Sequence, residues 1–514
     1  MTSRRAYLAA LVVVLLAGAS LRVVHLGRPA LCCDEFYDAF AAHSWLDGHG
    51  FNVPGREYTR ARLMVLATAA SFTAFGRHEW SARLPALVFG LLTLGATWWM
   101  ARALFGRSAA LAAVALVAIS PDAIDISRFA RLYAPLTFFV LIAAVASFET
   151  IERGPRWPLW GVAALSAELL ATHFHPVALT LGAAVCLYAA VMSAAALARR
   201  DWLSSAWSGA IAIGILAVAV AAAQLPSVRA TFVRAALEPL PWYRPTPGGA
   251  WVHHVYLRDE YGWLWIAVWA ATAVAIARAG RAGLFVALAF WVPFALISIV
   301  VATKHHRYTL FLLPFAWVML GVAVATIAGW WRSAAARRYR VPVAAAAAML
   351  VATGGPAAFP SFAAASHRPW RMTGPFATGF YHDWRGAAAA IGPLLPPDAL
   401  IVSDQWHASM YYLHRPSMRL YPADRDAAAG DWETISRRAD IIVQHAPELV
   451  NVQSQRPIWV VVSEGQWQRP GYYDPALVAF VRRNCRPAAL PPSATLVAFD
   501  CTMRTMYSAR TAMH

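Results

Sequence analysis

Two adjacent carboxylates, Asp34 and Glu35, follow the first long apolar segment of the chain. A carboxylate at a partly desolvated boundary can serve as a general base toward a hydroxyl, and a pair of carboxylates can hold a divalent cation. An acidic doublet in a loop can also be no more than a solvated surface. The doublet by itself leaves these three interpretations open.

A second group of polar side chains lies in the loop 120–135, between two apolar stretches, and contains Arg128, Arg131 and Tyr133. If this loop is helical, the two arginines share one face, because residues three apart are neighbours on a helix. Two guanidiniums together suit a phosphate, whose oxygens they can bind in a bidentate manner. The alternative is that both arginines reach toward lipid headgroups.

A third polar group separates two further apolar stretches and reads Lys304-His305-His306-Arg307-Tyr308. Its cationic members suit a second clamp on an anionic headgroup, with the Tyr308 hydroxyl as a hydrogen-bond donor. A basic anchor for lipid headgroups is the competing interpretation.

Two histidines, His173 and His175, lie between two short apolar segments. Together with Asp34 and Glu35 they could hold a divalent cation, the one cofactor that the sequence suggests. Histidines without a demonstrated partner more often line a polar turn, so the metal site has a simpler alternative.

The composition decides where such groups must lie. Hydrophobic residues make up 59% of the 514 residues and charged residues 14%, against about half and a quarter in soluble proteins. The formal net charge of +17 raises the question of a nucleic-acid partner, but long apolar runs between the basic residues favour a membrane and no nucleic acid. Lys304 is the single lysine, so no Walker A motif is present and an ATP-driven pump in this chain is excluded.

Apolar segments of membrane-spanning length recur along the first 360 residues. We expect eleven spans, at residues 6–26, 84–105, 108–121, 133–150, 157–173, 176–197, 207–225, 262–279, 282–302, 308–331 and 341–358. Placing the N-terminus in the cytoplasm makes every short cytoplasmic turn basic, as the positive-inside rule requires. The polar groups described above then fall on the outer face.

Two segments outside the spans have their own character. Residues 61–76 predict an amphipathic helix at the outer interface, within an outer loop 27–83. The tail 361–514 alternates strand-like runs at 399–403, 441–444 and 458–463 with helical stretches at 384–395 and 474–484, which is typical of a small α/β domain. Cys485 and Cys501 share this oxidising side and could pair. The predicted organisation is therefore a transmembrane domain, 1–360, and an extracytoplasmic α/β domain, 361–514.

The order of these motifs resembles the GT-C superfamily of membrane glycosyltransferases, in the branch that contains protein O-mannosyltransferases and the lipid A aminoarabinose transferase. In that family an Asp-Glu doublet follows the first helix, as Asp34-Glu35 does. Further matches are Phe75-Gly76, Arg83-Leu84-Pro85, Ser127-Arg128-x-x-Arg131-x-Tyr133 and Arg307-Tyr308. The family's Lys-Pro-Pro-Leu element is replaced by Arg60-Ala61-Arg62-Leu63, which keeps a charge but lacks both prolines.

The resemblance implies a polytopic α-helical fold and transfer of a hexose or pentose from a polyprenyl-phosphate donor to an outer lipid, glycan or protein acceptor. It implies Asp34 as general base, Glu35 beside it in the catalytic site, and inversion at the anomeric carbon. The residues implied for the donor phosphate are Arg60, Arg128, Arg131, Tyr133, Lys304, Arg307 and Tyr308. The expected location is the plasma (inner) membrane.

Other classes of protein share some of these features. A lipid-linked sugar flippase or exporter would need polar groups on both faces and no general base. A sensory membrane protein would need only a ligand-binding tail, and this class does not explain why Asp34 and Arg128 are present. An O-antigen ligase or polymerase is a closer alternative, which the sequence separates poorly from the transferase.

Overall fold

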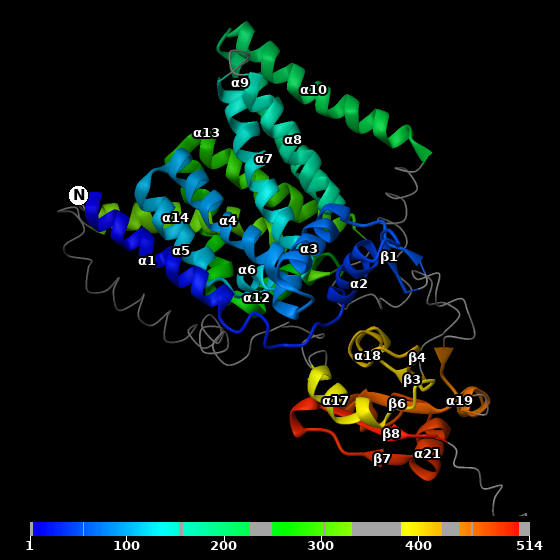
Figure 1. Cartoon of the computed structure of the whole chain (residues 1–514). Coiled ribbons are helices and arrows are strands. Elements are labelled where there is room, and N and C mark those ends of the chain that lie inside the picture. Colours follow the sequence, from blue (N-terminus) through cyan, green and yellow to red (C-terminus); the bar gives the residue numbers. More distant parts are fainter. Residues whose placement is uncertain are drawn as a thin grey trace, which may run out of the picture.

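A computed structural model describes residues 4–54, 56–153, 158–226, 249–301, 305–331, 382–423, 442–453 and 456–502. It contains a bundle of long helices and a smaller sheet domain (Figure 1). The long helices are α1 (Arg4–Val23), α4 (Glu79–Phe105), α5 (Arg107–Ile119), α7 (Tyr133–Arg153), α8 (Pro158–Phe174), α9 (Leu179–Ala198), α10 (Trp202–Gln224), α13 (Trp263–Ile299) and α14 (Leu313–Trp331).

The bundle has the properties of a multi-pass membrane domain. Seven helices among the described residues are long and apolar enough to span a membrane, or eight if α5 and the short α6 (Pro121–Ser127), bent by 65°, form one span. Large apolar side chains such as Val13, Leu165 and Ile213 are more than half exposed, as expected of a surface that faces lipid. This count is lower than the predicted eleven because α5 and α8 have only 13 and 17 residues, the two halves of α13 are counted together, and the predicted span 341–358 lies outside the described residues.

Helix α13 contains both predicted spans, 262–279 and 282–302, as a hairpin. At Gly280 the backbone leaves helical geometry, with φ 51° and ψ −115°. In a continuous helix residues eight apart lie about 12 Å apart along the axis. Here a Cβ on Gly283 would lie 2.0 Å from the carbonyl oxygen of Ala275. The indole of Trp291 also donates to the Thr272 hydroxyl at 3.0 Å, so the two halves pack side by side.

The first helix joins the bundle through a buried arginine. Arg22, 1% exposed near the end of α1, donates to the carbonyl oxygens of Val117 and Ala118 at 3.0 Å each. These carbonyls belong to the last turn of α5, where no intrahelical donor is available. Arg22 therefore fixes the ends of α1 and α5 beside each other.

Shorter elements gather at one end of the bundle, next to the sheet domain (Figure 1). They are α2 (Glu35–Leu46), α3 (Arg62–Phe75), α6, α12 (Val252–Tyr261) and a small hairpin of β1 (Asn52–Val53) and β2 (Arg56–Glu57). The predicted interfacial helix 61–76 corresponds to α3. Buried Asp122 of α6 accepts from the hydroxyls of Tyr256 and Tyr261, which ties α12 to α6.

The C-terminal sheet has the strand order β5-β4-β3-β6-β8-β7. Strands β5, β4, β3 and β6 run parallel, and β8 pairs antiparallel with β6 and β7. The bounds are β3 (Leu400–Ser403), β4 (Ser417–Leu420), β5 (Ile442–Val443), β6 (Ile458–Ser463), β7 (Arg486–Ala488) and β8 (Leu496–Asp500). Its helices are α17 (Trp384–Ile391), α18 (Trp406–Leu413), α19 (Ala446–Gln453), α20 (Glu464–Trp467) and α21 (Pro475–Asn484).

The α/β prediction for the tail is confirmed by these elements. The predicted strands correspond to β3, β5 and β6. The predicted helical stretch 384–395 contains α17, and the stretch 474–484 matches α21. Strands β4, β7 and β8 were not predicted. Ser417–Leu420 and Arg486–Ala488 are short and carry arginine or proline, which weakens the strand pattern there. The predicted boundary at residue 360 lies outside the described residues.

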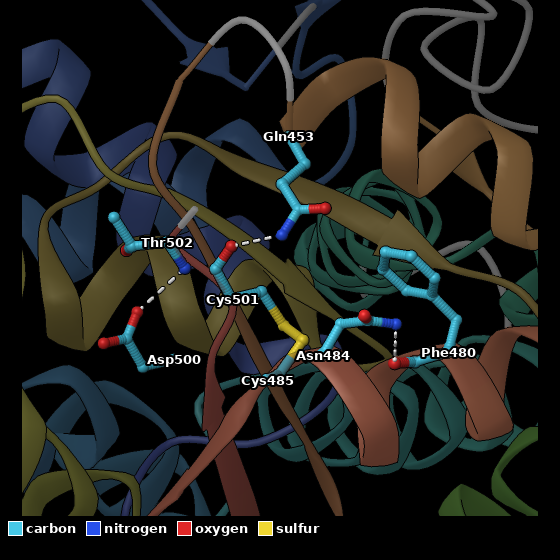
Figure 2. The surroundings of a disulfide bond; sticks show 7 residues. All are labelled: Gln453, Phe480, Asn484, Cys485, Asp500, Cys501 and Thr502. Atoms are coloured by element: carbon cyan, nitrogen blue, oxygen red, sulfur yellow. Dashed lines mark hydrogen bonds between the residues drawn. A yellow bond between two sulfur atoms is a disulfide. The ribbon is translucent and has the colours of Figure 1, made fainter. Parts of the chain in front are cut away.

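The predicted pairing of Cys485 with Cys501 is confirmed (Figure 2). The disulfide joins the end of α21 to the residue that follows β8, with 4.3 Å between the two Cα atoms. The amide of Gln453 in α19 donates to the Cys501 carbonyl oxygen at 2.6 Å, so three elements meet there. Cys32 and Cys33 carry no disulfide.

The hairpin in α13 generates a stability prediction. Gly283→Ala should lower the free energy of unfolding by about 1–3 kcal/mol or more, because the new methyl group meets backbone atoms of the opposite half. The measurement is the thermal unfolding midpoint of purified protein in detergent.

Gly182→Ala is the matched control for this change. A Cβ at Gly182, inside α9, meets nothing within 4 Å, so alanine should be neutral or stabilise by up to about 1 kcal/mol through helix propensity. Equal midpoints for the two variants would contradict the hairpin.

Candidate active site

The carboxylate of Glu35 is paired with a buried arginine. Arg83, in the second turn of α4, donates from Nε and Nη2 to the two oxygens of Glu35, at 2.8 Å each. Both side chains are fully buried. This bidentate geometry is the strong form of an arginine–carboxylate pair.

Further backbone groups complete this pair. Arg83 also donates to the carbonyl oxygens of Leu26, Pro29 and Ala30. The oxygens of Glu35 accept in addition from the backbone amides of Cys32 and Ala130, at 3.0 and 2.8 Å. The pair therefore joins the segment after α1, the start of α4 and the loop before α7, and fixes the backbone on both sides of Asp34.

Asp34 has a different environment from its neighbour. It caps α2 without a side-chain bond to the helix, so its carboxylate extends away from the first turn. The side chain is 38% exposed, and its Oδ2 accepts from Nη1 of Arg307 at 3.0 Å. Burial alone would raise the pKa of Asp34, but the charges of Arg131, Arg307 and Arg60 together hold the pKa below its usual value.

Arg131 lies beside Asp34 and is held from the other side. Its Nη1 donates to Oδ2 of Asp38 at 2.6 Å and to the Tyr58 hydroxyl oxygen at 2.7 Å. Burial raises the pKa of Asp38, and the ion pair with Arg131 limits that rise, to about 6. Asp38 and Tyr58 thus orient a guanidinium whose charge acts on Asp34.

Arg128 serves a different purpose from Arg131. Helix α6 ends at Ser127, and the chain from residue 128 to 132 is not helical, so the two arginines do not share a helical face. Nη1 of Arg128 donates to the carbonyl oxygens of Leu21 and Val24 at the end of α1. The structure therefore brings Arg131, Arg307 and Arg60 near Asp34 and uses Arg128 to hold α1.

Aromatic rings form a wall beside these charges. The ring of His175 lies 6.1 Å from that of Tyr133 and 5.1 Å from that of Tyr308, between centroids. Burial lowers the pKa of His175 to about 3, and the charges of Arg60 and Arg131 act in the same direction, so its imidazole is neutral. Arg60 is exposed at the rim, and none of the ion pairs between described residues includes it.

The four candidate metal ligands are not brought together. His173 Nε2 accepts from the backbone amide of Leu63, and His175 Nδ1 accepts from that of Val177. Glu35 is saturated by Arg83 and backbone amides. Within the described ranges, no group of three or more His, Cys, Asp or Glu residues is arranged to hold a metal. These residues do not fit a divalent cation, and Lys304 lies outside the described residues.

Several residues of the site were not predicted. Asp38 falls one turn after Asp34 on α2, so helical spacing could have identified it. Tyr37, on the same helix, contacts the ring of His407 from the C-terminal domain, with 4.8 Å between centroids. No local pattern around His407 indicates this contact, because it depends on how two distant parts of the chain pack.

The Glu35–Arg83 pair generates a second stability prediction. Glu35→Gln should lower the free energy of unfolding by about 3–5 kcal/mol, because Arg83 would remain buried without a compensating charge. Glu57→Gln is the control, since Glu57 pairs with Arg62 at an exposed position and should change the same quantity by less than about 1 kcal/mol. Lost activity with unchanged thermal unfolding would instead indicate a chemical role for Glu35.

Known proteins resemble this chain in sequence segments and in fold. Residues 61–225 match the dolichyl-phosphate-mannose-protein mannosyltransferase family. An 80-residue segment is 32% identical to the candidate mannosyltransferase YkcB of Bacillus subtilis (strain 168), and covers 16% of this chain and only 11% of that relative.

The structural similarity extends over nearly the whole chain. The crystal structure of ArnT from Cupriavidus metallidurans bound to undecaprenyl phosphate has a TM-score of 0.62 and 18% identity, covering 98% of this chain and 99% of that one. The apo oligosaccharyltransferase of Archaeoglobus fulgidus has a TM-score of 0.60 and 13% identity, covering 95% and 74%. At such identities the similarity establishes the fold. The chain is therefore a multi-pass membrane protein with the GT-C glycosyltransferase fold, as the motifs in its sequence predicted.

Proposed function

We propose that this protein is an integral membrane glycosyltransferase that moves a sugar from a polyprenyl-phosphate-linked donor to a hydroxyl of an acceptor outside the cytoplasm. The observation that carries the proposal is the half-exposed carboxylate of Asp34, held by Arg307 and surrounded by further guanidinium charges at one end of the helical bundle. The fold supports it, since the similar ArnT structure contains undecaprenyl phosphate.

The distribution of arginines supports the proposed orientation. Arg107 lies over the ring of Tyr7 near the start of α1, and Arg281 pairs with Glu152 at the end of α7. These basic turns are at the end of the bundle opposite α2 and the sheet domain. The positive-inside rule then assigns the N-terminus to the cytoplasm and Asp34 to the outer face of the plasma (inner) membrane. A disulfide in the sheet domain agrees with that side.

The cations near Asp34 suit the leaving group of the reaction. When the anomeric carbon–oxygen bond breaks, its electron pair goes to the phosphate oxygen, and polyprenyl phosphate departs. Arg307, Arg131 and Arg60 would stabilise that growing charge, with the hydroxyls of Tyr133 and Tyr308 nearby. Because Asp38 and Asp34 already orient two of these guanidiniums, little reorganisation is needed during the reaction.

Asp34 suits the role of base toward the acceptor. Its Oδ2 accepts from Arg307, while no hydrogen bond to another described residue involves Oδ1. A carboxylate with a pKa below about 3.9 cannot remove an alcohol proton in advance, so the proton must move as the new bond forms. The acceptor oxygen attacks the anomeric carbon while its proton passes to Asp34, and the sugar is transferred with inversion.

The sharpest test compares wild-type protein with Asp34→Asn in lipid vesicles supplied with labelled polyprenyl-phosphate sugars. Transfer and slow donor hydrolysis should both fall by about 100-fold or more in the variant, while donor binding persists. Asp47→Asn is the control, because Asp47 caps the other end of the same helix and pairs with Arg77 at an exposed position.

Two results would contradict the proposal. Equal turnover in wild type and Asp34→Asn would remove Asp34 from the chemistry. Movement of the donor between leaflets without release of sugar would indicate a flippase.

The pH dependence of the reaction gives an independent check of the base. The base works only when deprotonated, so kcat/KM should be retained above the pKa of Asp34 and lost as the pH falls through it. Arg307→Met removes a charge that lowers this pKa, and the acid limb should therefore move to higher pH. The measurement is the pH at half-maximal kcat/KM for donor hydrolysis.

Arg62→Met is the control for the pH measurement. Arg62 pairs with Glu57 away from Asp34, so its removal should leave the acid limb in place. An acid limb near pH 6 that Arg307→Met does not move would report on Asp38 and count against Asp34 as the base.

A further inference from the structure

We propose that His407 of the C-terminal domain forms the acceptor-facing wall of the active site and positions the acceptor by a hydrogen bond from its imidazole to an acceptor hydroxyl. This inference rests on the proposed function and adds a residue that determines how the acceptor binds. His407 is a positioning residue, and Asp34 remains the base.

The fold directs one edge of the sheet toward the active site. His407 is the second residue of α18, which begins after the carboxyl end of β3 and leads into the parallel strand β4. Figure 1 shows α18 between the sheet and α2. The carboxyl edge of parallel strands is where open α/β sheets usually place their ligands. Here that edge faces the helix that begins next to Asp34.

The position of α18 is fixed by direct contacts with the transmembrane domain. The Tyr412 hydroxyl accepts from the backbone amide of Leu31 at 2.6 Å, and the ring of Tyr411 lies 5.6 Å from that of Phe36. Arg385 of α17 pairs with Glu79 at the start of α4. These contacts join the C-terminal domain to residues on both sides of the Asp-Glu doublet, Leu31 before it and Phe36 after it. His407 therefore has a defined place relative to Asp34.

His407 lies beside an aromatic surface next to the base. Its ring is 4.8 Å from that of Tyr37, which is three residues after Asp34 and on the same side of α2. Tyr37 stacks on Tyr58 at 6.2 Å with an interplanar angle of 4°. Tyr58 in turn accepts from Arg131. A ligand hydroxyl near Asp34 is therefore bordered by these rings on the side of the C-terminal domain.

The imidazole of His407 has capacity for a further hydrogen bond. Its Nε2 is buried and has no hydrogen-bond partner among the described residues. A buried polar atom left unpaired is destabilising, so a ligand group that pairs with it is favoured. Burial lowers the pKa of His407 to about 3, so the ring is neutral. A neutral imidazole can donate from one nitrogen and accept at the other, which matches a hydroxyl, itself both a donor and an acceptor.

The same geometry distinguishes acceptor from donor. The guanidiniums that suit the donor phosphate, Arg307 and Arg131, come from the transmembrane domain, where the lipid tail of the donor must remain. The base must touch the acceptor hydroxyl. A neutral hydrogen-bonding group that approaches Asp34 from the C-terminal domain therefore faces the acceptor.

The test uses three variants of the full chain in lipid vesicles. His407→Phe keeps a ring and removes the nitrogens, His407→Gln keeps a hydrogen-bonding group, and His445→Phe changes an exposed histidine of the same domain as the control. Acceptor probes are a serine- and threonine-containing peptide, a glycolipid with free sugar hydroxyls, and water, whose use is measured as donor hydrolysis.

His407→Phe should raise the KM for the acceptor that wild type uses by about tenfold, the equivalent of one hydrogen bond, without changing donor hydrolysis or donor binding. His407→Gln should recover part of the loss, and His445→Phe should match wild type. A change confined to the acceptor KM is not expected from a general loss of structure.

Two outcomes would overturn the inference alone. One is an unchanged acceptor KM in His407→Phe. The other is a parallel loss of transfer and hydrolysis in both His407 variants, which would assign the residue to folding or to the donor. If wild type neither transfers nor hydrolyses any donor, the proposed function fails, and the role of His407 fails with it.

Discussion

The structure around the active site depends on the buried ion pair between Glu35 and Arg83. Two opposite charges with no access to water are stable only if each remaining hydrogen-bonding group finds a partner. Backbone carbonyls from residues 26–30 and amides from Cys32 and Ala130 supply those partners. Because the pair and its partners together come from three separate segments, the pair determines where the first outer loop, α4 and the loop before α7 meet.

The two members of the Asp-Glu doublet therefore have opposite environments. Successive residues at a helix start point about 100° apart, so one side chain can turn inward while its neighbour turns outward. Glu35 is saturated and fully buried, and Asp34 is partly exposed with one oxygen paired to Arg307. A motif that reads as two equivalent acids thus contains a structural residue and a chemical candidate. The structural residue gives the chemical one a fixed backbone.

What the sequence could predict followed from local patterns. Apolar length identified the helices, including both halves of α13, and alternation of strands and helices identified the sheet domain. The role of Arg128 was not predictable, because it depends on α6 ending at Ser127 and on carbonyls at the end of α1. His407 was equally hidden, since a single histidine beside Trp406 gives no sign of which surface its helix faces. Local sequence patterns predict local chemistry, and they do not predict how distant segments pack.

The balance of charge around Asp34 favours the transition state of the proposed reaction over its ground state. Arg60, Arg131 and Arg307 face two carboxylates in this region, Asp34 and Asp38, so the described cluster carries an excess of positive charge. A polyprenyl-phosphate sugar is a phosphodiester with one negative charge, and its departing phosphate gains more as the glycosidic bond breaks. Fixed cations therefore stabilise the leaving group more than the bound donor, which is the condition for accelerating the chemical step. The same argument requires the acceptor side to be neutral, because a further cation there would weaken Asp34 as a base.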